Sequence, residues 1–412
     1  MSKGGWSMFN PERGAIMKKV LTLLIMISAS AVSDTPDDEV QWRSFKEVPW
    51  PGDDHPLECI ITGDLQGFRV VVFNWSEMSW SWSLVDLDLY GNETGRRLLE
   101  SDEGVLEHWL ECSFFNNGFA ALIGSRLGPG PVTLMTLPPG DEAVLTETAV
   151  TGLEEYPEVA VTSMETLEDG SFLIAGTGID DSGGRDCFTG RLDESGVITG
   201  LRTLPARAEL QLEDTSMEVL EDGTFLLSFE EDAFMGGVAV ARLDADGTEM
   251  WNTYLETGSE FTSVINGFLE LDNGDMICAG AFDQLGTLKL RGLLARFDPA
   301  LSVAWQSAHL YRDQTCFTGL FQDWDGRIIS HGWTADGSRE RFATEDIDVL
   351  LAETDPQGEW IFGVSIPMEG DQIPAAVFER GIGEYYVIGE HRPDGGGDAD
   401  LFLGRVVIGD FR

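Results

Sequence analysis

Cysteine and histidine are scarce in this chain, and neither forms a recognisable metal or catalytic pattern. The 412 residues include five cysteines and five histidines. An odd number of cysteines spread over the whole chain is no disulfide framework, and none has the C-x-x-C spacing of a zinc site. No HExxH or Ser-His-Asp motif organises the histidines. The sequence therefore favours a non-enzymatic role over catalysis.

Two pairs of these cysteines and histidines each allow two interpretations of their role. Cys59 and Cys112 each close a Leu-Glu-Cys triplet before a turn, so we expect them on related strands of neighbouring repeats. They either form a disulfide or serve as buried small side chains. His331 and His391 fall near the same strand of two adjacent repeats. They have either structural hydrogen bonds or a shared metal or base site.

Basic residues are also few. The chain has 26 Lys and Arg against 72 Asp and Glu, a formal net charge of -46. Such a surface repels nucleic acid and anionic lipid, and it permits cationic partners or divalent metals. We therefore expect no nucleic-acid partner.

Long hydrophobic runs are missing after the N-terminus. Lys18 and Lys19 precede an apolar run over residues 20–27, and small residues at 29–31 suit a signal peptidase. We predict a signal peptide over residues 1–31, with Met17 as a candidate true start, and a single domain over residues 32–412. No later run reaches the length of a membrane span. The sequence thus predicts a secreted protein, periplasmic or extracellular, with no integral membrane segment after cleavage.

One motif recurs along the whole chain. LEDGSFLIAG is the clearest copy of a turn followed by a strand, and its turn glycine recurs at intervals of 51 to 57 residues. These glycines are Gly67, Gly118, Gly170, Gly223, Gly274, Gly326 and Gly383. A second glycine follows six residues later in five copies, namely Gly124, Gly176, Gly280, Gly332 and Gly389. This regularity indicates a repeat architecture.

Each repeat has room for four short strands and shows no helical periodicity. In the third copy we expect strands over residues 159–166, 171–177, 187–192 and 197–204. Four DxxG turns, starting at Asp88, Asp193, Asp244 and Asp355, join the third strand to the fourth. Sheets of this size bury both faces by packing around an axis, so we predict an all-β, seven-bladed β-propeller.

The last repeat lacks its fourth strand. It ends at LFLGRVVIGDFR, whereas VQWRSFKEV near the N-terminus carries Trp42 where Trp251, Trp305 and Trp360 begin other fourth strands. We therefore expect residues 39–47 to complete the last blade and close the ring.

These repeats resemble known families. The copies LEDGSFLIAGTG and LFLGRVVIG are similar to repeats of bacterial secreted β-propeller proteins, which implies the fold and export. The segment ARLDADGTEMW resembles the repeat of pyrroloquinoline quinone propellers, which implies a quinone cofactor. Those enzymes typically have eight blades and an adjacent cysteine pair, and this chain has neither.

Two kinds of candidate site remain. Acidic loops between the second and third strands should gather at one mouth of the channel, where carboxylates could hold Ca²⁺. The candidate ligands are Asp186, Asp346, Asp348, Asp398 and Asp400. The alternative is that aspartates just before a strand bind loop N–H groups. Trp80 and Trp82 would face one side of a strand and form a stacking platform for a ligand, or else pack between blades.

We therefore expect a monomeric binding or scaffold protein that engages a protein, glycan or cation through the loop face or channel mouth. The alternative is a carbohydrate-active or quinone-type enzyme with its site in the central channel. The fold cannot choose between them.

Overall fold

The computed structural model describes part of the chain. The described residues are 41–49, 53–62, 65–76, 79–99, 108–115, 118–125, 132–137, 146–167, 169–204, 216–220, 222–231, 237–257, 263–284, 289–323, 325–336, 345–393 and 398–408. They form twenty-eight strands in seven four-stranded antiparallel sheets. Within these ranges there is no helix with the length and apolar character that a membrane span requires.

Six blades each consist of four strands that follow one another in sequence. Blade 1 contains β2 (Asp53–Ile61), β3 (Gly67–Ser76), β4 (Ser79–Asp88) and β5 (Glu93–Leu99). Blade 2 contains β6 (His108–Phe115), β7 (Gly118–Ser125), β8 (Thr133–Leu137) and β9 (Thr146–Ala149). Blade 3 contains β10 (Glu158–Thr166), β11 (Phe172–Ile179), β12 (Arg185–Leu192) and β13 (Ile198–Leu204).

The other three contiguous blades follow the same plan. Blade 4 contains β14 (Ser216–Val219), β15 (Phe225–Glu231), β16 (Gly237–Leu243) and β17 (Glu249–Glu256). Blade 5 contains β18 (Ser263–Glu270), β19 (Met276–Gln284), β20 (Lys289–Phe297) and β21 (Val303–His309). Blade 6 contains β22 (Gln314–Gln322), β23 (Ile328–Asp336), β24 (Glu345–Thr354) and β25 (Trp360–Ile366).

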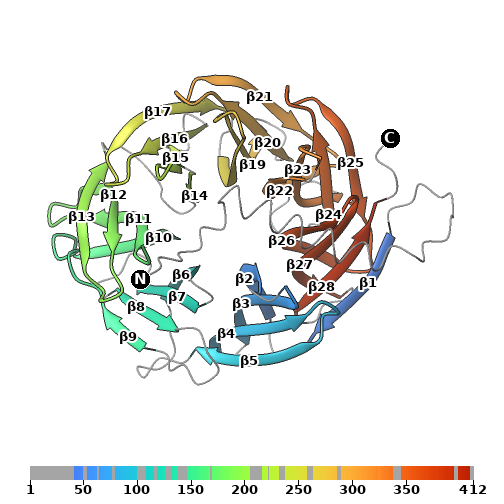
Figure 1. The fold of residues 1–412 in the computed structure, drawn as a ribbon, viewed down its shortest axis with the longest axis horizontal. Coiled ribbons are helices and arrows are strands. Elements are labelled where there is room, and N and C mark those ends of the chain that lie inside the picture. The colour runs from blue at the N-terminus through green and yellow to red at the C-terminus, as the bar shows by residue number, and fades with distance from the viewer. Residues whose placement is uncertain are drawn as a thin grey trace, which may run out of the picture.

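The seventh sheet, here the composite blade, is assembled from both ends of the chain. It contains β26 (Asp371–Gly381), β27 (Glu384–Arg392), β28 (Asp400–Val407) and, as its fourth strand, β1 (Gln41–Val48). β1 pairs antiparallel with β28, and Glu47 lies opposite Phe402. Figure 1 shows the sheets around one axis, with their first strands innermost and their fourth strands on the rim.

These sheets confirm an all-β propeller with four strands per sheet, and the predicted strands of the third repeat lie within two residues of β10 to β13. The sequence's count of seven blades needs a correction in one respect. Contiguous segments form six blades, and the seventh repeat supplies only three strands, so that sheet exists through pairing with β1. The closing strand spans residues 41–48, and residues 39 and 40 lie outside the described residues.

The two glycines of each repeat are required for different physical reasons. The turn glycine adopts the left-handed backbone, as at Gly274 with φ of 78°, which a side chain disfavours. The second glycine lies where the first strand of the blade bulges. Gly280 pairs with Ile265 just before a bulge, and a Cβ at Gly280 would lie 1.9 Å from the Val264 carbonyl oxygen. The two glycines of the motif therefore mark a close approach between two backbone segments as well as a turn.

Apolar side chains between neighbouring sheets form the core. One cluster joins blade 1 to the composite blade through Val70, Val85, Ile388 and Leu401. Another joins blade 6 to the composite blade through Leu351 and Val387. Within the composite blade, Phe402 packs on Phe45 of β1 at a ring-centroid distance of 4.9 Å. Burial on both faces of each sheet accounts for the near-continuous apolar runs in the inner strands.

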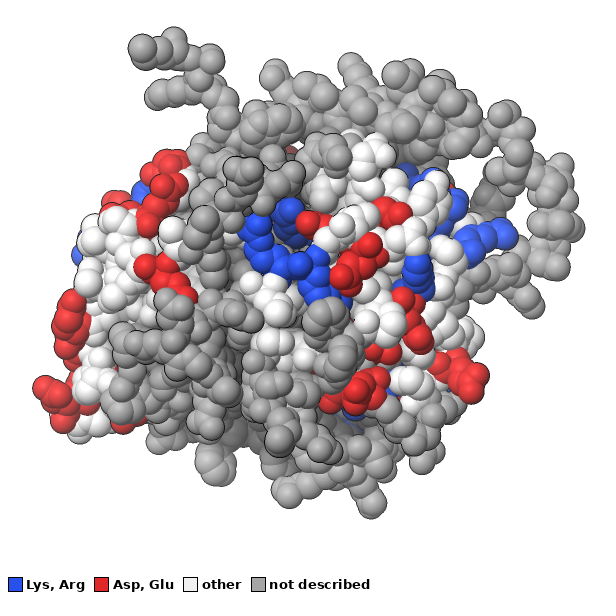
Figure 2. Space-filling model, turned by 90° about the horizontal axis from the view of Figure 1, so that it is seen from below, with Lys and Arg blue, Asp and Glu red and all other residues white. Residues whose placement is uncertain are grey.

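Ion pairs recur beside the turn between the first and second strands. An arginine of the third strand pairs with an acid of that turn in blades 3, 4 and 5, as Arg242 does with Asp222 at 2.6 Å. In blade 1 the acid is on the third strand instead, and Asp86 pairs with Arg69 of the second strand at 2.7 Å. Figure 2 shows the rim of the ring from below the view of Figure 1, where Lys and Arg lie beside Asp and Glu. Among the outer strands, β5 contains Arg96 and Arg97, and β1 contains Arg43 and Lys46.

Candidate functional site

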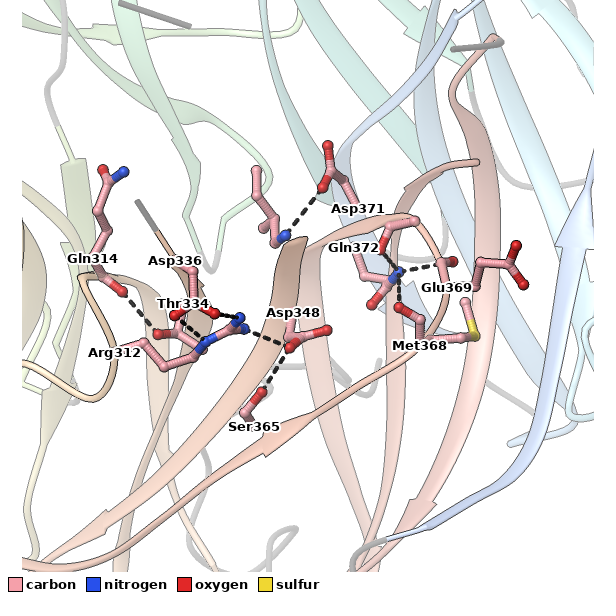
Figure 3. A network of polar contacts seen from close by, with 12 residues as sticks. Arg312, Gln314, Thr334, Asp336, Asp348, Ser365, Met368, Glu369, Asp371 and Gln372 are labelled. Carbon is pink, nitrogen blue, oxygen red and sulfur yellow. Dashed lines mark hydrogen bonds and ion pairs between the residues drawn. The ribbon is translucent and has the colours of Figure 1, made fainter. Parts of the chain in front are cut away.

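A network of polar contacts lies at blade 6 on the predicted acidic face (Figure 3). Arg312, in the connection between β21 and β22, donates from Nε to Asp336 Oδ1 at 2.9 Å and from Nη1 to Asp348 Oδ2 at 2.6 Å. The Ser365 hydroxyl of β25 donates to the same Asp348 oxygen at 3.0 Å. One guanidinium thus ties β23 and β24 of blade 6 to the connection from blade 5, and Ser365 joins β25 to the same network through Asp348.

The two carboxylates held by Arg312 differ in environment. The side chain of Asp336 is 59% exposed, and its hydrogen bond from Arg312 lowers the pKa of this carboxyl below the usual value. Asp348 is buried. Burial raises its pKa, and the opposing contributions of Ser365 and Arg312 are smaller. Asp348 therefore depends on Arg312 to remain charged inside the protein.

Aspartates at the start of first strands join neighbouring blades. Asp371 Oδ1, at the start of β26, accepts the backbone N–H of Ile347 of blade 6 at 3.0 Å. Asp53 Oδ1, at the start of β2, accepts the N–H of Ala399 of the composite blade at 2.7 Å. The next N–H, of Asp54, donates to the Ala399 carbonyl at 2.6 Å. These contacts fix the first turn-proximal residues of β24 and the loop before β28.

Asp54 is the most perturbed carboxyl of this face. It is 0% exposed, and it accepts a hydrogen bond from Asn74 Nδ2 at 2.7 Å. Its Oδ2 atom is buried and has no hydrogen-bond partner in the described part of the protein. Burial, only partly offset by Asn74, raises the pKa of Asp54 to about 6.

Two histidines lie at the seam where the ring closes. His55 Nδ1 of β2 lies 2.5 Å from Glu390 Oε2 of β27, and this hydrogen bond raises the pKa of His55. His391 Nδ1 lies 2.6 Å from Glu47 Oε1 of β1, and its Nε2 lies 2.9 Å from the Glu369 carbonyl oxygen. Both histidines therefore connect segments that are far apart in sequence.

The other two interior histidines have no acidic partner among their described contacts. Burial lowers the pKa of His309 and of His331 to about 4, so both rings are neutral near pH 7. The Thr318 hydroxyl lies 3.2 Å from His331 Nδ1. His331 and His391 lie on β23 and β27 of adjacent sheets as predicted, and each has its own structural contacts.

The five candidate calcium ligands are distributed over three sheets. Asp186 is on β12 of blade 3, Asp346 and Asp348 are on β24 of blade 6, and Asp398 and Asp400 lie before and at the start of β28. Of these, Asp348 is held by Arg312 and Ser365, and Asp400 lies opposite His391. The Asp346 side chain lies outside the described side chains. Among the described residues, no three acidic, histidine or cysteine side chains are close enough to hold a metal ion.

The aromatic and cysteine candidates are mainly packing residues. Trp82 is 6% exposed and lies against Phe73 at a ring-centroid distance of 4.4 Å, so a ligand could reach its ring only after a rearrangement. Trp80 is on β4, and its side chain lies outside the described ones. Cys59 and Cys112 are on β2 and β6, the first strands of neighbouring blades, as predicted, and both are thiols.

Sequence reasoning missed Arg312, Asp54 and the capping aspartates. Arg312 acts through partners 24 and 36 residues away, so no local motif indicates it. A usable signal existed for Asp53 and Asp371, since both occupy the first position of the first strand.

Comparison with known proteins shows the fold alone. No protein-family model matches the chain, and no curated protein matches its sequence. Among solved structures it is similar to a protein of unknown function from Dyadobacter fermentans (8% identity, TM-score 0.53, 90% of this chain and 99% of that one). It is also similar to the polysaccharide lyase Uly1 (10% identity, TM-score 0.55, 92% and 94%). A third similar structure is the Dos1 propeller (10% identity, TM-score 0.50, 90% and 95%). At these identities the chain shares a propeller fold with proteins of different kinds.

Proposed function

We propose that this protein is a non-enzymatic binding or scaffold protein, and that it presents the loop face of blades 5, 6, 1 and the composite blade to its ligand. The observation that carries the proposal is the cross-linking of this face between blades, by Arg312 at blade 6 and by Asp371 and Asp53 at the composite blade and blade 1. A surface fixed before binding loses little conformational entropy when a ligand arrives.

The strongly perturbed groups also favour binding over catalysis. A catalytic acid or base has to reach its substrate. Asp54, His309 and His331 have pKa values shifted by burial, and all three are at most 8% exposed. Their shifts come from the interior of the propeller, where a substrate has no access. The alternative of a carbohydrate-active enzyme would require an exposed group of this kind.

The same proposal includes export of the protein and a class of ligand for it. The segment that supports export, residues 18–31, lies outside the described residues. The net charge of -46 favours a cationic or neutral ligand over an anionic one. Ca²⁺ stays among the candidates, through the predicted carboxylates other than Asp348.

Thermal melting with defined probes tests the proposal. The full chain is melted alone and with chitosan oligomers, neutral cello-oligosaccharides, Ca²⁺ or EDTA, and each probe is recovered for mass spectrometry. A ligand at a hundred times its Kd adds about 2.7 kcal/mol, roughly 3 °C in Tm for a chain of this size. The proposal predicts such a rise with a probe that is recovered unchanged. Chemical conversion of a probe, or an unchanged Tm with every probe, would contradict it.

A further inference from the structure

The outer strands of the sheets differ in how they protect their free edges. Edge strands usually carry charges that prevent another strand from pairing with them. β1, β5, β9, β13 and β17 each contain at least one charged residue. β21 (VAWQSAH) and β25 (WIFGVSI) contain no Asp, Glu, Lys or Arg. Two neighbouring edges of the propeller therefore lack this protection.

β25 is the more apolar of the two. Ile361 is 57% exposed, and the Trp360 ring lies beside Gly363, where an added Cβ would be 2.0 Å from the ring. Tyr311 stacks on the Trp360 ring at a centroid distance of 6.2 Å. In β21, the equivalent strand of blade 5, the Gln306 side chain donates a hydrogen bond to the Glu256 carbonyl oxygen of blade 4. β25 thus offers an apolar strand with an aromatic neighbour.

The backbone of β25 is paired on one side. In the described part of the chain it is the last strand of its sheet, and its strand pairing is with β24 alone. Among the described strands, none pairs with β25 on the side away from β24, and this is the arrangement in which extended peptides add to a sheet edge.

The charges of the protein and of the residues around β25 determine which kind of strand can pair with this edge. A second copy of the chain would bring another charge of -46 to the same interface, so self-pairing is opposed by repulsion. Acidic side chains lie at both ends of β25, with the exposed Glu359 before it and the exposed Glu369 after it. Basic residues of an incoming strand would meet these acids, and apolar residues would meet Ile361.

We propose that β25 is a docking edge for an extended basic segment of a partner protein, which adds to blade 6 as a fifth strand. The site is on the outer rim, so the inference goes beyond the loop-face binding proposed above and does not depend on it.

A synthetic peptide that alternates lysine and valine over seven residues, the length of β25, serves as the probe. Its binding to the full chain is measured by calorimetry, and its position by hydrogen–deuterium exchange. The proposal predicts new protection in residues 360–366 and none in β5 or β17. The same peptide with alternate N-methylated amides keeps its charges and loses its donors, and it should not protect β25.

Two matched variants locate the contact. Ile361 and Met250 occupy equivalent positions, each the second residue of its fourth strand and the residue at the bulge in the pairing with the third strand, and both are exposed. Ile361→Lys should weaken peptide binding about tenfold through like-charge repulsion, while Met250→Lys should leave it unchanged. No binding, equal binding of the N-methylated peptide, protection spread over all outer strands, or equal effects of the two variants would each overturn the proposal.

Discussion

The buried carboxyl of Asp54 makes the stability of the ring depend on pH in a direction opposite to ordinary acid denaturation. Its pKa is about 6 in the folded protein against an ordinary 3.8, so the folded state binds this proton more tightly than the unfolded state. Stability from this group is fully present below pH 3.8 and is lost as the pH rises through 6. The shift corresponds to about 3 kcal/mol, most of it between pH 4 and pH 7.

Asp54→Asn tests this reasoning because asparagine is neutral at every pH. Urea unfolding of the full chain and of the variant is measured from pH 4 to pH 7. The free energy of unfolding of the variant, relative to the wild type, should rise by about 2.5 kcal/mol from pH 4 to pH 7. Asp180→Asn is the control, since hydrogen bonds from Ser182 lower the pKa of Asp180 and its effect should be flat over this range. A flat difference for Asp54→Asn would refute the reasoning.

Three further predictions concern single contacts. Arg312→Met leaves the buried Asp348 carboxylate without its cation and should cost about 3 kcal/mol in urea unfolding; adding Asp348→Asn should recover roughly half of that loss, and no recovery would contradict the pairing. Gly363→Ala forces the Trp360 ring off its strand and should cost about 1–3 kcal/mol, with a shift in tryptophan fluorescence that an unperturbed ring would not show. His391→Ala removes the contact with β1 and should cost about 2 kcal/mol, with faster amide exchange in β1 than in β5; equal exchange would show that the contact does not hold the strand.

The fold could be predicted because each repeat is marked by residues that lie close together in the sequence. Turn glycines such as Gly274 adopt a positive φ, and second glycines such as Gly280 lie at a close backbone crossing, so both are required wherever the repeat occurs. Asp193 and Asp244 cap the predicted DxxG turns by accepting the backbone N–H groups of the following residues. Constraints within one short segment are visible in a single sequence.

The candidate site was less predictable because it forms between blades. The acidic content of the loop face is plain in the sequence, yet nothing in it shows that Asp348 is neutralised by Arg312. The burial of Asp54 depends on the loop before β28, more than 340 residues away in sequence. Trp82 has the alternating position along β4 that a ligand platform would need. Its ring instead packs against Phe73 of the paired strand β3. Contacts of this kind require the three-dimensional arrangement.

Closure of the ring by β1 places blade 1 beside the composite blade, and the seam contacts of Asp54, His55 and His391 follow from it. Hydrogen–deuterium exchange of the full chain tests this closure most directly, through the backbone amides of residues 41–48. Slow exchange in β1, similar to that of the rim strand β5, is the predicted result. Exchange as fast as that of an unstructured peptide would contradict the closed ring.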